Sequence, residues 1–306
     1  MTPTGIFTSR IGEIAGITAS LTWAIGSLVF SRAAAPAGAL NLFKNCVAAA
    51  LFLATVVLGG VLRGQRPFEG CEPSGAAWLA GSAFIGIAVG DTLYLRSLQI
   101  LGARRCLVLT TFAPPIAGIL AAFIFNESLR PLAWCGMGVT LGGVCWVLLD
   151  RTTAAEPSGR YPGSTRVGVL FGILGAACQA LGVILSRQGM ERMDPLEAAC
   201  FRLVTAAIIT LLYAVATSKL RPWLRHLAHP GVAGRLAAAS ASGTFLGIWL
   251  SLISYKYAEV AVATTLTSLT PIFILPILWI FLGQRIRVTA VLGALLAVGG
   301  VALLLC

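Results

Sequence analysis

The hydrophobic residues of this chain are gathered into long runs, and polar residues stand mainly between the runs. A helix that crosses a membrane needs roughly 20 mostly apolar residues, because it rises about 1.5 Å per residue across about 30 Å of hydrocarbon. Nine runs without a charged residue are of about this length, and they cover residues 14–31, 45–62, 106–126, 131–149, 167–186, 203–218, 236–255, 260–284 and 288–306. The pattern predicts a chain that crosses a membrane many times.

A tenth span is predicted at residues 75–97, which are as apolar as the other runs apart from Asp91 and Arg96. The segments between the spans are short and leave no room for a soluble domain. The first span is long and is followed by nine others, so we interpret it as a retained helix and not as a cleaved signal peptide. The predicted fold class is an all-α integral membrane protein with ten transmembrane helices.

The second half of the sequence repeats the first. Pro114 and Pro271 are 157 positions apart, and each follows an apolar segment that contains threonine. The same spacing, or one within two positions of it, joins further pairs: Ser97 with Ser254, Gly136 with Gly293, Gly143 with Gly300, Phe43-Lys44 with Phe201-Arg202, and Ser31-Arg32 with Ser186-Arg187. Five helices in each copy make the second copy enter the membrane from the opposite side, so we predict two inverted repeats. Their expected bounds are 12–149 and 167–306, with a connecting loop at 150–166.

The composition supports a membrane environment. Only 11% of the residues are charged, against about 25% in an ordinary globular domain, and the mean hydropathy is +0.89. The formal net charge of +11 comes from basic residues scattered among short loops, which favours anionic lipid headgroups over nucleic acid as partner. Neither the eight cysteines nor the two histidines show the spacing of metal ligands, so we expect no metal and no cofactor.

The order of several short motifs resembles a known family. Trp23 lies in the first span, Phe43-Lys44 and Phe201-Arg202 begin the second span of each repeat, and Asn126-Glu127-Ser128-Leu129 closes the fourth. In this order, and in two copies, the motifs resemble the drug/metabolite transporter superfamily, in particular its EamA-type ten-helix permeases, over Gly12 to Cys306. The second copy departs from the pattern, because Gln284 stands where the first has Glu127.

The resemblance implies a permease or exporter of the cell (inner) membrane, with the first four helices of each repeat around a central cavity. We expect secondary active transport of a small metabolite such as an amino acid by alternating access, with the substrate and membrane lipid as partners. An intramembrane enzyme and a channel-like scaffold are the alternatives, but the sequence contains no HExxH, G-x-S-x-G or P-loop motif, so we do not expect an enzyme. A homodimer through the glycine-rich fifth helix stays open.

Asp91 is the foremost candidate for the binding site. A carboxylate inside a membrane span costs several kcal/mol unless it meets a partner or water, so such residues usually mark a pathway. The repeat places Ile248 opposite Asp91, which predicts a single acidic group that serves a substrate cation or a proton. Tyr94 follows on the same helical face. The alternative for Asp91 is a structural ion pair near the membrane interface.

Five other side chains complete the predicted substrate site. Lys44 and Arg202 occupy matching positions in the two repeats, and each could contact the substrate or extend to the lipid headgroups. Gln179 lies in the middle of a span, where its amide could bind substrate or a neighbouring helix. Trp249 and Tyr255 could turn their rings to the cavity or belong to the aromatic belt at the membrane surface.

Hydroxyl groups next to prolines mark predicted hinge or cavity-lining positions. Thr110 precedes Pro114, and Thr267 precedes Pro271 in the second repeat. A proline inside a helix frees a carbonyl one turn earlier, and such a break is tolerated where it lines a cavity. A plain helix kink is the alternative for both sites.

The orientation in the membrane is predicted differently by charge and by family. With both termini on one side, that side collects seven basic residues and the other collects thirteen. The positive-inside rule therefore favours external termini, whereas the resemblance implies cytoplasmic ones. We retain cytoplasmic termini as the prediction.

Overall fold

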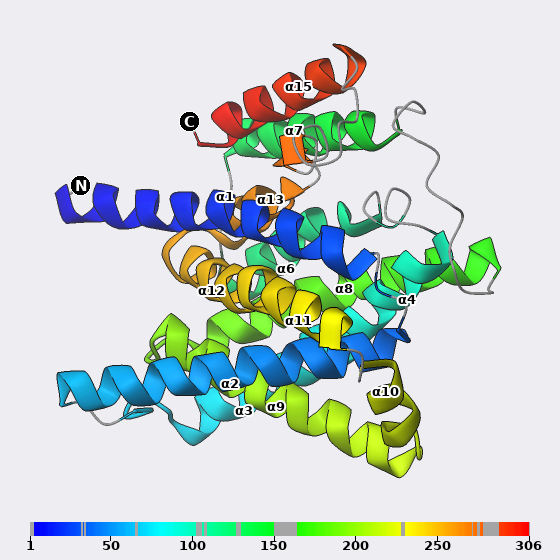
Figure 1. The fold of residues 1–306 in the computed structure, drawn as a ribbon. Coiled ribbons are helices and arrows are strands. Elements are labelled where there is room, and N and C mark those ends of the chain that lie inside the picture. The colour runs from blue at the N-terminus through cyan, green and yellow to red at the C-terminus, as the bar shows by residue number, and fades with distance from the viewer. Residues whose placement is uncertain are drawn as a thin grey trace.

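The computed structural model describes residues 3–31, 33, 35–64, 67–101, 106, 109–126, 130–149, 164–227, 230–270, 272–273, 276–277 and 288–305. Helices account for most of these residues, and no strand occurs among them. The predicted all-α class is therefore confirmed. Figure 1 shows the long helices running side by side in one bundle.

The first half of the chain forms α1 (Pro3–Ser31), α2 (Ala37–Arg63), α3 (Pro73–Ser82), the π-helix η1 (Ala83–Asp91), α4 (Thr92–Leu101), α6 (Ala113–Phe125) and α7 (Pro131–Leu149). The second half forms α8 (Thr165–Gly189), α9 (Pro195–Ala216), α10 (Leu220–Leu227), α11 (Pro230–Ala239), the π-helix η2 (Ser240–Leu246), α12 (Gly247–Tyr257), α13 (Val260–Thr267) and α15 (Val288–Leu305).

Six segments of the described chain are long and apolar enough to cross a membrane: Arg10–Phe30, Ala37–Leu62, Pro73–Leu101, Thr165–Gly189, Pro195–Ala216 and Gly231–Tyr257. Two of them are composite, since α3, η1 and α4 run on from one another, as do α11, η2 and α12. The other predicted spans correspond to α6, α7, α13 and α15, which are shorter or adjoin residues outside the described part. The total of ten remains a prediction.

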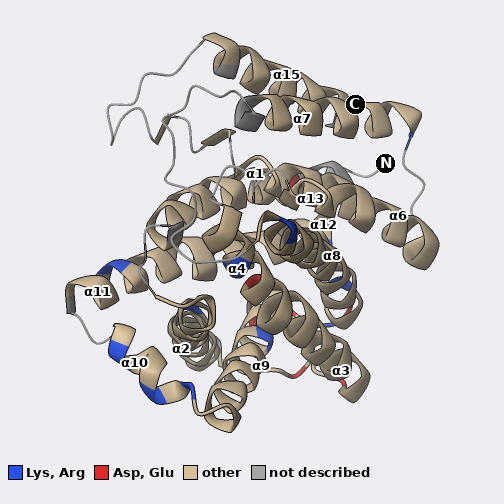
Figure 2. Ribbon diagram, turned by 90° about the vertical axis from the view of Figure 1, so that its right-hand side faces the viewer, with Lys and Arg blue, Asp and Glu red and all other residues tan. Residues whose placement is uncertain are grey.

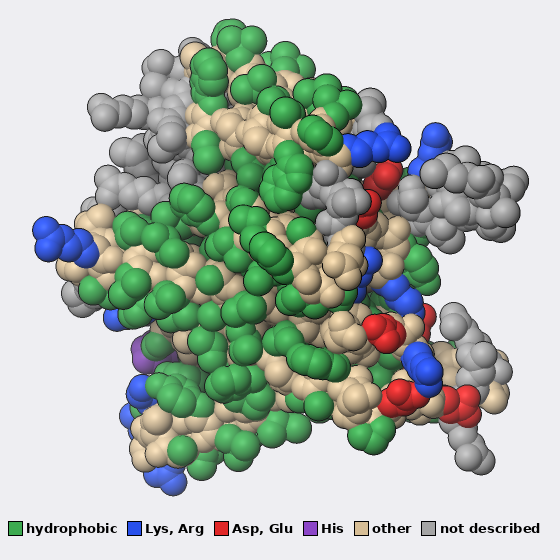
Figure 3. Space-filling model, turned by 180° about the vertical axis from the view of Figure 1, so that it is seen from behind, with side chains coloured by type: hydrophobic (Ala, Val, Ile, Leu, Met, Phe, Trp, Pro, Cys, Tyr) green, Lys and Arg blue, Asp and Glu red, His purple; other side chains and the backbone are tan. Residues whose placement is uncertain are grey.

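The surface has the character expected in lipid. Figure 3 shows hydrophobic side chains across the middle of the visible face and charged side chains toward its two edges. Large apolar residues point outward, among them Leu62, which is 77% exposed, and Phe123, which is 82% exposed. So much outward apolar surface is unfavourable in water and favourable in a bilayer. The chain is a multi-pass integral membrane protein.

Glycines bring the first helix of each half against the third helix of the other half. A Cβ atom added to Gly243 of η2 would lie 3.0 Å from the Cα atom of Gly26 in α1. One added to Gly182 of α8 would lie 2.8 Å from the Cα atom of Gly86 in η1. Only glycine permits such close approach of two helix backbones. The two contacts use corresponding positions, because Gly86 and Gly243 are 157 residues apart.

The π-helices follow the same spacing. η1 begins at Ala83 and η2 at Ser240, again 157 residues apart. A π-helix is rare and is often found at functional sites. Each half therefore carries the same irregularity in the middle of its third span.

The fifth helices, α7 and α15, pack along one another at one side of the molecule (Figures 1 and 2). The Thr140 hydroxyl donates to the Gly136 carbonyl at 2.8 Å and also lies 3.4 Å from the Ala297 carbonyl of α15, and Thr140 and Ala297 are again 157 residues apart. Corresponding positions of the two halves thus face each other directly in this pair of helices.

Replacing Gly182 with valine is expected to destabilise the fold, because the new side chain would press on the Gly86 backbone. Overpacking of this kind typically costs about 1–3 kcal/mol. Thermal unfolding of the purified protein in detergent measures the loss. Gly138→Val is the matched control, since nothing lies within 4 Å of a Cβ atom at Gly138. Equal melting temperatures for the two variants would contradict the described packing.

Candidate functional site

A cavity of about 250 Å³ lies between the two halves of the chain. Its wall is built by α1, α2, η1, α4, α6, α8, α9, η2, α12 and α13, so nearly every helix of the central bundle contributes. The volume lies just below the range of about 300–1,000 Å³ that is common for small-molecule sites. The cavity therefore suits a small solute.

Corresponding positions of the two halves meet in this wall. Lys44 and Arg202, which match at a spacing of 158, both line it. Six further pairs in the wall are 157 residues apart: Ile87 and Thr244, Asp91 and Ile248, Tyr94 and Ser251, Leu98 and Tyr255, Thr110 and Thr267, and Ala113 and Thr270. The backbone around the cavity is thus pseudo-symmetric, whereas the side chains differ within most pairs.

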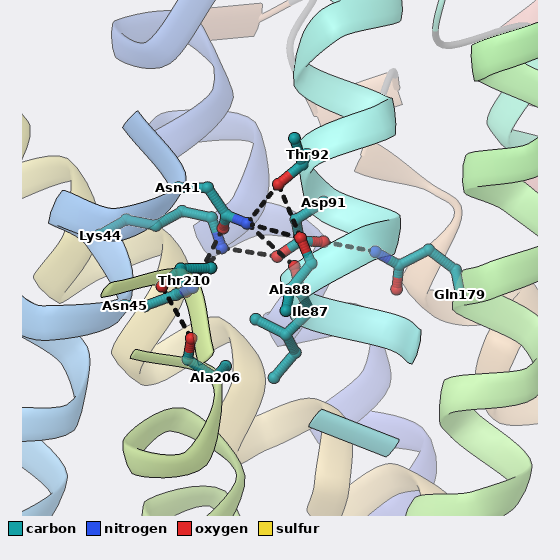
Figure 4. A network of polar contacts seen from close by, with 10 residues as sticks. All are labelled: Asn41, Lys44, Asn45, Ile87, Ala88, Asp91, Thr92, Gln179, Ala206 and Thr210. Carbon is teal, nitrogen blue, oxygen red and sulfur yellow. Dashed lines mark hydrogen bonds and ion pairs between the residues drawn. The ribbon is translucent and has the colours of Figure 1, made fainter. Parts of the chain in front are cut away.

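The centre of the first half's wall is a buried ion pair. Lys44 Nζ lies 2.5 Å from Asp91 Oδ2, and Gln179 Nε2 donates to Asp91 Oδ1 over 2.6 Å. Lys44 also donates to Asn45 Oδ1 at 3.2 Å. Figure 4 shows Asp91 held between the lysine of α2 and the glutamine of α8. Both oxygens of the carboxylate are therefore engaged.

Asn41 ties α2 to the π-helix beside this ion pair. Its amide donates to the Ile87 carbonyl at 3.0 Å, to the Ala88 carbonyl at 3.3 Å and to Thr92 Oγ1 at 2.9 Å (Figure 4). Irregular backbone in a membrane helix is tolerated where a side chain satisfies its carbonyl groups. Asn41 does this for η1, and it lies one helical turn from Lys44.

The ion pair bears on the alternatives left open for these two residues. Lys44 does not extend to the lipid headgroups, because it is only 7% exposed and contacts Asp91. Asp91 is not an acidic group without a partner, since packing of α2 against the third span supplies the lysine. The pairing was the alternative for Asp91, although it lies at the cavity and not at the membrane interface.

Arg202 of α9 contrasts with Lys44. It is 7% exposed and lines the cavity, but its Nε atom has no hydrogen-bond partner among the described residues. Asp91 and Tyr255 lie near enough to act on its charge. In the first half, Lys44 is paired with Asp91. In the second half, Arg202 corresponds to Lys44, but the position that corresponds to Asp91 holds the apolar residue Ile248.

The second half lines its part of the cavity with hydroxyl groups. Tyr255 lies beside the hydroxyls of Ser251 and Thr267. Thr244, Thr264, Ser268 and Thr270 add further hydroxyls to the same wall. The corresponding first-half residues Ile87, Leu98 and Ala113 are apolar. At these positions the second half is therefore the more polar of the two.

The structure brings together most of the predicted site residues. Asp91, Tyr94, Gln179, Tyr255, Lys44, Arg202, Thr110 and Thr267 all line the cavity. Trp249 does not line it: its ring packs against Phe245, with centroids 6.2 Å apart, and against the hydrophobic core.

The proline predictions have different outcomes. Pro114 is buried in the first turn of α6, where a proline costs no helical hydrogen bond, so it begins this helix and does not break one. It is not among the cavity-lining residues. Pro271 lies outside the described residues.

Sequence reasoning missed Asn41, Asn45, Thr244 and Ser251. Asn41 stands three positions before Lys44 and four before Asn45 in a mostly apolar helix, and both of these spacings indicate a shared polar face. The repeat spacing applied to Tyr94 would have found Ser251, whereas no candidate residue led to Thr244. Among the described residues, no group of three or more His, Cys, Asp or Glu side chains could hold a metal ion.

Comparison with known proteins gives three findings. The model of the EamA-like transporter family matches residues 10–149 and again residues 166–306. The chain is 24% identical over 241 residues to the "Uncharacterized transporter sll0355" of Synechocystis sp. (strain ATCC 27184 / PCC 6803 / Kazusa), which covers 73% of this chain and 72% of that protein. A protein of known crystal structure, 18% identical, has the same fold with a TM-score of 0.74 over 95% of this chain and 94% of its own.

Proposed function

The chain belongs to the EamA-like transporter family and is a membrane transporter, and from this premise we propose that it moves a small metabolite across the cell (inner) membrane as a secondary active transporter. The observation that carries the proposal is the cavity, whose wall takes corresponding positions from both repeats. A binding site at the interface of two repeats is the arrangement from which alternating access follows.

The proposed architecture is ten transmembrane helices in two inverted five-helix repeats, 12–149 and 167–306, with cytoplasmic termini. The six long spans together with α6, α7, α13 and α15 supply the ten helices. The crossed glycine contacts support the inversion, because α1 meets η2 just as α8 meets η1. A two-fold axis in the membrane plane relates such contacts.

Alternating access would work by exchange between these equivalent contacts. The two halves would adopt different conformations and would exchange them between the two states of the transporter. The cavity would therefore open to one side of the membrane at a time. The glycine contacts at Gly26 and Gly182 let the first and third spans pivot on one another without side chains between them. The ion pair and Arg202 lie at the cavity and would meet the solute in both states.

The experiment tests access to the cavity from each side. Thr110→Cys is introduced into a background without the native cysteines, and inside-out and right-side-out vesicles are treated with a membrane-impermeant maleimide. We expect labelling in both preparations, while bilayer recordings show no ion-channel steps. Ser20→Cys is the control, because Ser20 is fully buried and does not line the cavity. Labelling of Thr110→Cys from one side only, or steady ion conduction, would refute alternating access.

A further inference from the structure

We infer that the transported solute is a small organic anion, a carboxylate that also carries hydroxyl groups, and that Arg202 is its counter-charge. The inference rests on the proposed transport function, which it deepens by naming the substrate class. Three features of the cavity carry it: the balance of charges, the state of the Asp91 carboxylate and the hydroxyl groups of the second half.

Three charged residues of the described chain line the cavity: Lys44, Asp91 and Arg202. The first two neutralise one another at 2.5 Å, which leaves the positive charge of Arg202. A buried charge without a partner is strongly unfavourable, and an anion removes that cost. The planar guanidinium group matches a carboxylate through two parallel hydrogen bonds, and the unpaired Nε atom is one of its donors. The free cavity is thus prepared for a single negative charge.

The same site is poorly suited to a cation. Asp91 is the only acidic side chain that lines the cavity within the described residues, and Lys44 and Gln179 bind its two oxygens. A substrate ammonium group would have to displace Lys44 and would then stand near two positive charges. Like charges in a site of low dielectric repel strongly. Asp91 therefore holds Lys44 and does not serve as the receptor for a substrate cation.

The hydroxyl groups of the second half specify the rest of the solute. Ser251 donates to the Gly247 carbonyl at 2.6 Å, Thr264 to Val260 at 2.7 Å and Thr267 to Thr264 at 3.0 Å. A hydroxyl has one hydrogen and two lone pairs, so each of these groups offers the cavity an acceptor. They complement O–H or N–H groups of a solute. The apolar residues of the first half are left to contact its hydrocarbon.

The test uses lactate and glycerate as carboxylate probes, lactamide as the neutral match of lactate, and ethanolamine as the cation. Binding is followed by the thermal stabilisation of the purified protein, and transport by uptake of the labelled probes into proteoliposomes. We expect at least one carboxylate to bind and to be transported. Loss of the charge-assisted hydrogen bonds should weaken lactamide relative to lactate on the order of ten- to hundred-fold.

Variants assign the charge to Arg202. Arg202→Gln should lose carboxylate affinity by a similar factor, and Arg202→Lys, which keeps the charge, should recover part of it. Arg225→Gln on α10 is the control, because Arg225 is exposed and does not line the cavity. If Arg202→Gln does not fold, the comparison of lactate with lactamide on the wild-type protein still shows whether the site prefers an anion.

Equal binding of lactamide and lactate, preference for ethanolamine, unchanged carboxylate affinity in Arg202→Gln, or no binding of any carboxylate probe would each overturn the anion assignment. Uptake of ethanolamine alone would do so while leaving the transport function in place. Failure of the two-sided labelling experiment would instead refute the transport mechanism, so the two failures are distinguishable.

Discussion

Replacement of Asp91 with alanine is expected to lower the free energy of unfolding by about 3–5 kcal/mol and to abolish transport. The variant leaves the Lys44 ammonium group, at a side-chain exposure of 9%, without the carboxylate that lies 2.5 Å away. Asp91→Asn should behave similarly, because it keeps the shape and removes the charge. The buried lysine is the reason that the neutral amide should cost stability as well as transport.

Thermal unfolding of the purified variants measures this effect. Replacing both partners, as in Lys44→Met with Asp91→Leu, should restore much of the stability but not transport, because no buried charge is then left without a partner. Glu72→Ala is the control, since Glu72 pairs with Arg192 at an exposed site, where an ion pair contributes about 0–1 kcal/mol. Wild-type stability of Asp91→Ala would show that the ion pair does not hold the fold.

Ile248→Asp is expected to reduce carboxylate affinity on the order of ten- to hundred-fold while the protein stays folded. Ile248 is the counterpart of Asp91, and Arg202 is the counterpart of Lys44. The pseudo-symmetry therefore predicts that an aspartate at position 248 would lie beside Arg202, in the same way that Asp91 lies beside Lys44. The new aspartate would pair with the Arg202 guanidinium group, which would then no longer be free to bind the substrate carboxylate.

Carboxylate binding and thermal stability are measured together on this variant. Ile248→Asn is the control, because asparagine has nearly the same size as aspartate and is also polar but carries no charge. This variant should lose much less carboxylate affinity. If Ile248→Asp binds carboxylates as well as the wild type does, Arg202 and residue 248 do not meet and the assigned counter-charge is wrong. The outcome is independent of whether Arg202 itself tolerates substitution.

The sequence was sufficient to predict the helical class and the family, because long apolar runs and a nearly constant repeat spacing can be recognised without any knowledge of packing. It also identified Asp91, Gln179, Tyr255 and Arg202, since polar groups inside a membrane span are costly and few. The cavity therefore contains most of the residues that were predicted for it.

The pairing of these residues could not be predicted in the same way. Lys44 and Asp91 are 47 positions apart, and only the packing of α2 on the third span brings them together. Trp249 was misplaced because an aromatic residue in a span packs as readily on the core as on a cavity. Pro114 was misplaced because the start of α6 was not known, and a proline has opposite effects at the first turn and in the interior of a helix.

The two π-helices have a consequence for the rotational phase of the third spans. Each residue advances an α-helix by about 100°, so a stretch with wider turns shifts the azimuth of everything that follows it. If only one half contained such a stretch, Tyr94 and Ser251 would point in different directions relative to the glycine contacts before them. In both halves the stretch begins at the same position, over nine residues in η1 and seven in η2, and both residues line the cavity. The third spans of the two halves therefore keep the same rotational phase, and there the halves differ in the chemistry of side chains that are aimed at a common centre.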